Sequence, residues 1–119
     1  MRSKKLLEQA IKDLEIGCYD KAVSAAYFAV RKAAEELLRS LGEHIPRRDD
    51  KLANAVENKG LAEIADTLRM LYSYRKDADY GNGVTREIAV ICVESAKRAL
   101  DILLDMIEGI NGSTYKDLI

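Results

Sequence analysis

Apolar and polar residues recur along this chain with the period of about 3.6 residues that is typical of amphipathic α-helices. Glycines, which commonly end helices, divide this pattern at Gly17, Gly42, Gly60, Gly81, Gly83, Gly109 and Gly112. No segment has the two-residue alternation of a half-buried β-strand. The pattern predicts an all-α fold of four long helices and a short one. A length of 119 residues suits a single domain spanning 1–119.

The first two predicted helices have clear start signals. Ser3 can cap a helix that ends near Gly17, and Asp20 can cap a longer helix that reaches Leu41. On a helical wheel each of them has one apolar face, which predicts contact with the core. These faces consist of Leu6, Leu7, Ala10, Ile11 and Leu14 in the first helix, and of Ala22, Val23, Ala26, Tyr27, Val30, Ala33, Ala34, Leu37 and Leu41 in the second.

The remaining elements follow a loop at 45–50 that contains the single proline of the chain. A short helix is predicted to start near Lys51, and a fourth helix near Leu61. Thr85 is predicted to open the last and longest helix, which is predicted to end near Ile110.

Phe28, the one phenylalanine, is predicted to project from the second helix on its polar side. The charged residues expected around it are Lys21, Lys32, Glu35 and Arg39. An exposed aromatic side chain at such a position is either incidental or part of a surface that contacts a partner.

The last helix is apolar around most of its circumference, because its charged residues fall within a narrow arc. One apolar stripe contains Ile88, Ile91, Cys92, Ala99, Ile102 and Met106, and the other contains Ala89, Val93, Ala96, Leu100, Leu104 and Ile107. Either the chain encloses this helix, or part of it is a self-association surface. We predict a homodimer through this helix and take Leu100 as an interface position.

Acidic and basic residues are almost balanced, with a formal net charge of −1. Non-specific binding to nucleic acid depends on many lysines and arginines that neutralise phosphates. The balance therefore argues against a broad nucleic-acid surface but allows a local basic patch.

Neither a metal site nor a membrane segment is predicted. Cys18 and Cys92 stand alone, and His44 is the one histidine, so no metal-binding cluster is expected. No apolar run is long enough to cross a membrane, and no signal-peptide hydrophobic region is recognised. We expect a cytoplasmic protein without a cofactor, in which both thiols remain reduced.

Arg75 and Asp79 introduce charge into the apolar face of the fourth helix. Their spacing of four residues allows an ion pair, and Tyr72, Tyr74 and Tyr80 are expected around them. Such a pair can fix the end of the helix against the next helix. Alternatively, this region can hold a phosphate or an RNA backbone, and the candidate ligand-binding residues are then Arg75, Lys76, Asp79 and Tyr80.

Two stretches of sequence resemble HEPN domains. The alanine-rich and aromatic-rich segment at 19–38 is similar to the second helix of that family. The run Tyr74-Arg75-Lys76-Asp77-Ala78-Asp79-Tyr80-Gly81 resembles the Arg-Lys-x-Ala-Asp-Tyr motif of small stand-alone HEPN proteins. This resemblance implies an up-and-down helical bundle that forms homodimers. It also implies a small nucleotidyltransferase as partner, in a toxin–antitoxin pair.

The resemblance also implies a test for catalysis, because toxic HEPN proteins are metal-independent ribonucleases. Their signature is an arginine followed four to six residues later by a histidine. Arg75 matches the arginine and Lys76 the polar residue after it, but Tyr80 occupies the histidine position. An unperturbed tyrosine or aspartate does not replace that acid–base group near neutral pH. His44 would fill the gap only if a dimer brought it to Arg75.

Three functions remain open at this point. The leading hypothesis is a homodimeric interaction module that binds a nucleotidyltransferase and a nucleotide or RNA, without efficient catalysis. The second is an active ribonuclease toxin, with Arg75, Asp79 and Tyr80 as candidate catalytic residues. The third is a structural adaptor without a ligand.

Overall fold

In the computed structural model, the backbone is described for residues 2–81 and 83–118 and the side chains for 2–81 and 83–111. Five α-helices and no β-strand occur in these parts of the chain, which confirms the predicted all-α fold. The helices are α1 (Arg2–Glu15), α2 (Tyr19–Ser40), α3 (Asp49–Asn58), α4 (Ala62–Tyr80) and α5 (Arg86–Leu118).

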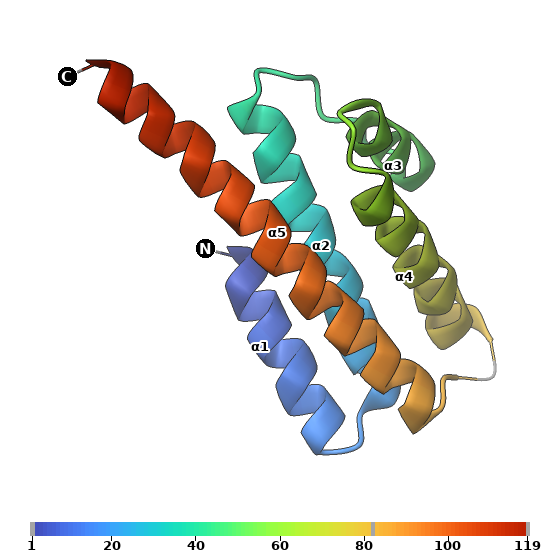
Figure 1. Cartoon of the computed structure of the whole chain (residues 1–119). Helices are drawn as coiled ribbons and strands as arrows, with labels where there is room; N and C mark the ends of the chain where they lie inside the picture. Colours follow the sequence, from blue (N-terminus) through green and yellow to red (C-terminus); the bar gives the residue numbers. More distant parts are fainter. Residues whose placement is uncertain (1, 82, 119) are drawn as a thin grey trace.

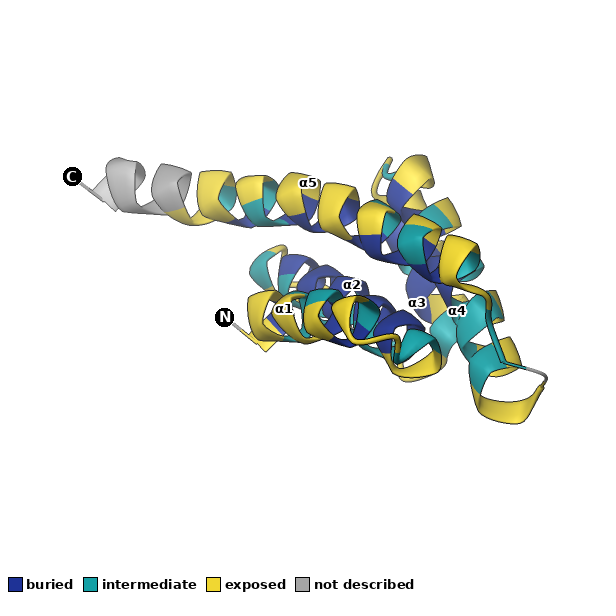
Figure 2. Ribbon diagram, turned by 90° about the horizontal axis from the view of Figure 1, so that it is seen from below, coloured by how far each residue is buried: buried dark blue, intermediate teal, exposed yellow. Residues whose placement is uncertain are grey.

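The long helices form an up-and-down bundle around α2 (Figure 1). Helix α2 packs against α1 and α5 on one side and against α4 on the other. The short helix α3 packs mainly against α4. Figure 2 shows that α5 lies across α1 and α2, with its buried side facing them and its exposed side facing away.

Two of the predicted helix caps are wrong. Ser3 lies within α1 and is buried, because the helix already begins at Arg2. Asp20 lies in the first turn of α2, where its Oδ1 accepts a hydrogen bond of 3.0 Å from the backbone N–H of Val84. This bond ties the start of α2 to the α4–α5 connection. Asp20 therefore acts in a tertiary contact and does not cap its own helix.

Other helix ends agree with the sequence or differ by a few residues. Helix α5 begins directly after Thr85, close to the predicted start, and the Thr85 Oγ1 caps it by accepting a hydrogen bond of 3.2 Å from the N–H of Ile88. Helix α3 begins at Asp49, slightly before Lys51, and two aspartates in its first turn suit the positive end of the helix dipole. The end predicted near Ile110 is wrong, because α5 continues to Leu118.

The predicted apolar face of α2 forms the centre of the core, and its alanines allow neighbouring helices to approach closely. Leu41 is the exception, because it follows the last residue of α2 and is exposed. The buried residues of α2 are Ala22, Val23, Ala26, Tyr27, Ala29, Val30, Ala33, Ala34, Leu37 and Leu38.

The two apolar stripes of α5 have different environments. Most of the second stripe is buried, and Leu100 is only 1% exposed within this single chain. Leu100 therefore belongs to the core of the chain, and it is not a surface position for a dimer. In the first stripe Cys92 and Ala99 are buried, whereas Ile91 and Ile102 are 52% and 43% exposed.

Within the residues that the structure describes, no helix is both long enough and apolar enough to span a membrane.

Candidate functional site

Arg75 lies on the side of α4 that faces α2, where its guanidinium packs against two aromatic rings. The guanidinium carbon is 4.7 Å from the ring centroid of Phe28 and 5.5 Å from that of Tyr27. The prediction that Phe28 projects among charged residues is therefore wrong, because this half-buried ring supports Arg75. A planar guanidinium is weakly hydrated and stacks well on aromatic faces, which makes this arrangement favourable.

The predicted contact between Arg75 and Asp79 is present, but it is neither fully buried nor a well-aligned hydrogen bond. The Arg75 Nε and the Asp79 Oδ2 are 3.4 Å apart, and the two side chains are 27% and 38% exposed. Nε itself is buried and has no hydrogen-bond partner of good geometry. Because both groups reach solvent, their attraction is worth under about 1 kcal/mol.

A second carboxylate beside Arg75 was not predicted from the sequence. Asp49, at the start of α3, accepts a hydrogen bond of 2.6 Å from Arg31 Nη1 and a short one from the hydroxyl of Tyr27. Arg31 Nη2 donates to the carbonyl of Arg47 at 3.0 Å. Burial raises the pKa of Asp49, and the positive charge of Arg75 opposes that rise.

The network of Tyr27, Arg31 and Asp49 holds the start of α3 against the middle of α2. The sequence signals only half of it, since Tyr27 and Arg31 are four residues apart on one helix. Asp49 is 18 residues from Arg31 and lies beyond a loop, so no local sequence pattern connects the two residues.

The terminal nitrogens of Arg75 remain available as donors. Among the described residues, none accepts a hydrogen bond from them. Nearby, the Nζ of Lys76 is 5.2 Å from the ring centroid of Tyr72, and that ring is 5.8 Å from the ring of Tyr27. Two cations therefore lie on one aromatic platform. We call this group the Arg75 surface; it consists of Tyr27, Phe28, Tyr72, Arg75 and Lys76.

A cavity of about 320 Å³ adjoins the Arg75 surface at Tyr72. Its other lining residues, Arg48, Asp49 and Asp50, come from the start of α3. Arg48 and Asp50 form an exposed ion pair of 2.8 Å there. The cavity has both charges at its rim and a tyrosine ring in its wall, and neither Arg75 nor Lys76 lines it.

The other predicted site residues occupy different environments. Tyr80 is the last residue of α4 and is 87% exposed, so it does not enclose Arg75. Tyr74 is half-buried against the core. Of the four candidate ligand-binding residues, Arg75 and Lys76 belong to the aromatic platform, Asp79 lies beside Arg75, and Tyr80 projects from the helix end.

No acid–base group of the kind expected for a ribonuclease lies at Arg75 within the described chain. His44 is exposed in the α2–α3 connection and has no contact with Arg75. Cys92 is buried in the core, where burial raises the pKa of its thiol to about 11 and keeps it protonated at neutral pH. The described residues also contain no cluster of three or more His, Cys, Asp or Glu side chains able to hold a metal ion.

Comparison with known proteins agrees with this helical architecture. The HEPN domain family matches residues 1–107, so the chain belongs to the HEPN domain family. The chain is also similar to a UPF0332 protein of Archaeoglobus fulgidus. The two are 28% identical over 118 residues, which cover 84% of this chain and 90% of the relative.

Proposed function

We propose that this HEPN-family chain is a homodimeric interaction module. In this proposal the Arg75 surface binds a phosphate-bearing ligand, either a nucleotide or RNA, and the chain has little or no ribonuclease activity. The observation that carries the proposal is the state of Arg75: its guanidinium rests on aromatic rings, its terminal nitrogens have no acceptor among the described residues, and no imidazole is near.

The surroundings of Arg75 favour an anionic ligand. Asp49 is already bonded to Arg31 and Tyr27, so its charge is largely compensated. Asp79 meets only the Nε side of Arg75, which leaves the other donors of the guanidinium for a phosphate. Lys76 adds a second positive charge, and the ring of Tyr72 offers an apolar face to a ligand base.

Efficient RNA cleavage is not part of the proposal, because it needs a base and an acid as well as a cation. General acid–base catalysis typically contributes about 10² to 10⁴-fold to a rate. Arg75 supplies only the positive charge, and Tyr80, at the position of the family histidine, is directed into solvent. Tyr27 and Asp49 also carry groups that can exchange a proton, but they are hydrogen-bonded to each other and to Arg31.

A small nucleotidyltransferase, as in a toxin–antitoxin pair, is the proposed protein partner. Membership of the HEPN family supports this part of the proposal. Affinity capture of the chain from the cells that produce it should recover a nucleotidyltransferase in a stoichiometric amount. A capture without such a protein would contradict the partner and leave the ligand proposal unaffected.

The ligand proposal is tested by binding of ATP and of a labelled single-stranded RNA to the purified chain. Replacing Arg75→Ala removes the free donors and should weaken binding at least about 10-fold, since a hydrogen bond to a charged group contributes roughly 1.5–3 kcal/mol. Arg39→Ala is the matched control, because it removes the same charge from an exposed position on α2. Equal losses in both variants would indicate non-specific charge attraction, and no loss in either would contradict the proposal.

A further inference from the structure

The cavity beside the Arg75 surface contains a carboxylate that is already saturated and one that is not. We call it the α3 cavity; it is lined by Arg48, Asp49, Asp50 and Tyr72. Arg48 donates to both oxygens of Asp50, at 3.1 Å and 2.8 Å, and the backbone N–H of Lys51 donates to the Asp50 Oδ1 at 2.9 Å. Both oxygens of Asp50 therefore have donors within the chain.

Asp49 presents the acceptor of the α3 cavity that remains open. Its Oδ1 is turned towards α2, where it accepts hydrogen bonds from Arg31 and from the hydroxyl of Tyr27. No other described residue donates to its Oδ2, and the side chain is 26% exposed. Because Asp49 lines the cavity, Oδ2 is the oxygen that a ligand there can reach. An ionised carboxylate only accepts hydrogen bonds, so the cavity suits a ligand group that donates one.

Tyr72 connects the α3 cavity with the Arg75 surface, because its ring belongs to both. The Nζ of Lys76 is 5.2 Å from the centroid of this ring. The ring of Tyr27 lies 5.8 Å from that of Tyr72 and 5.5 Å from the Arg75 guanidinium. Burial raises the pKa of Asp49 and the charge of Arg75 opposes that rise, so this carboxylate and the guanidinium are within electrostatic reach. One ligand can therefore meet both.

The charges of the two neighbouring regions determine which end of a nucleotide suits each of them. The α3 cavity has two carboxylates and one guanidinium in its lining, so it repels a phosphate. Arg75 and Lys76 supply the positive charges outside it. A nucleobase is uncharged and gains an aromatic contact from Tyr72. The phosphates therefore suit the Arg75 surface and the base suits the cavity.

We propose that the α3 cavity recognises the base of the ligand and selects adenine and cytosine over hypoxanthine and uracil. Adenine and cytosine present an exocyclic amino group that donates hydrogen bonds, whereas hypoxanthine and uracil have a carbonyl oxygen in its place. The Asp49 Oδ2 accepts from the amino group and repels the carbonyl oxygen. This inference rests on the proposed function and adds the base selectivity of the same site.

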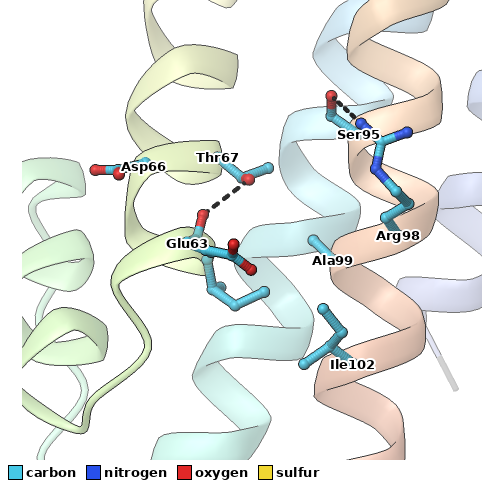
Figure 3. A pocket seen from close by; sticks show the side chains of 8 residues that line it. Glu63, Asp66, Thr67, Ser95, Arg98, Ala99 and Ile102 are labelled. Atoms are coloured by element: carbon cyan, nitrogen blue, oxygen red, sulfur yellow. Dashed lines mark hydrogen bonds between the residues drawn. The ribbon is translucent and has the colours of Figure 1, made fainter.

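The groove between α4 and α5 provides a comparison within the same chain (Figure 3). It has a volume of about 350 Å³, and its lining includes the carboxylates of Glu63 and Asp66. None of the described residues that line it is aromatic. Asp66 accepts a hydrogen bond of 3.2 Å from Arg69 and lies more than two helical turns before Arg75 on α4. Asp66→Asn is therefore a matched control for Asp49→Asn.

The selectivity of the wild-type chain is measured by isothermal titration calorimetry with two matched pairs of nucleotides. ATP and inosine triphosphate differ in the 6-amino group of the purine, and CTP and UTP differ in the 4-amino group of the pyrimidine. We expect the amino-bearing nucleotide of each pair to bind at least about 10-fold more tightly, because the other leaves the Asp49 oxygen without a donor. Equal affinities within both pairs overturn the inference.

Asp49→Asn inverts the hydrogen bonding in the α3 cavity without changing the size of the side chain. Arg31 can only donate, so the amide oxygen of the variant stays with Arg31 and the amide NH₂ takes the place of Oδ2. The NH₂ donates to the carbonyl oxygen of hypoxanthine, so this variant should bind inosine triphosphate more tightly than ATP. Asp66→Asn should keep the wild-type order. Far-UV circular dichroism checks that both variants are folded.

The outcomes separate recognition of the base from recognition of the phosphate. An ATP preference that survives in Asp49→Asn, or that Asp66→Asn removes as well, overturns the role of Asp49. If ATP and inosine triphosphate bind equally but Arg75→Ala weakens both at least about 10-fold, the base selectivity is wrong and the Arg75 surface of the proposed function stands. If the wild-type chain binds none of the four nucleotides, the inference is overturned, and the labelled RNA alone decides the proposed function.

Discussion

At the scale of single residues, Phe28 and Asp49 determine how Arg75 is presented. The ring of Phe28 packs against the guanidinium of Arg75. Tyr27 is the second ring in contact with the guanidinium, and Asp49 holds it in place by accepting a hydrogen bond from its hydroxyl. Neither role follows from local sequence. Phe28 lies among charged residues on a helical wheel, and only the approach of α4 to α2 gives it a partner. Arg75 and Asp79, in contrast, were predictable, because their spacing within one helix fixes their separation.

The two carboxylates near Arg75 should contribute unequally to stability. Asp49→Ala removes an acceptor shared by Arg31 and Tyr27 and should reduce the free energy of unfolding by about 2 kcal/mol. Asp79→Ala loses only a solvent-exposed ion pair and should cost under about 1 kcal/mol. Urea unfolding followed by circular dichroism measures both values. A larger loss of unfolding free energy in Asp79→Ala than in Asp49→Ala would contradict the greater contribution assigned to the Asp49 network.

At the scale of helices, periodicity predicted the elements well and their ends less well. Ser3 and Asp20 have side chains that commonly cap helices, yet Ser3 is buried within α1 and Asp20 bonds to the backbone of Val84. For both residues, contacts with other parts of the chain determine where the side chain lies, rather than the preference for a capping position. Thr85, in contrast, does cap its helix, because its hydroxyl accepts a hydrogen bond from the N–H of Ile88 in the first turn of α5. Helix α5 passes Gly109, since the propensity cost of one glycine, about 1 kcal/mol, does not by itself end a helix.

Two glycines with opposite backbone requirements provide a test at this scale. Gly109 lies inside α5, and a Cβ added there meets nothing within 4 Å, so Gly109→Ala should stabilise the chain by about 0.5–1 kcal/mol. Gly17 follows α1 with a φ of +82°, so Gly17→Ala should destabilise it by about 1 kcal/mol. Thermal unfolding of the two variants should shift in opposite directions. A stabilised Gly17→Ala variant would show that this turn tolerates an L side chain without strain.

At the scale of the whole molecule, the core of α2 was predictable because its alanines and branched residues share one face. The division of α5 into a buried side and an exposed seam was not. Its two stripes are chemically alike, and the position of α1 and α2 decides which one is covered. For the same reason the sequence alone predicts an interface role for Leu100, although this residue lies in the core. Contacts between distant segments, such as Arg31 with Asp49, have no local signature in one sequence.

The central claim is that the Arg75 surface binds a phosphate-bearing ligand without efficient cleavage. Its most direct test is a titration of labelled single-stranded RNA with the wild-type chain in EDTA, in which binding and strand integrity are followed in the same samples, alongside Arg75→Ala. We predict saturable binding that Arg75→Ala weakens at least about 10-fold, with the RNA intact throughout. RNA that is cut rapidly by the wild-type chain and left intact by Arg75→Ala would contradict this account and identify the chain as an active ribonuclease.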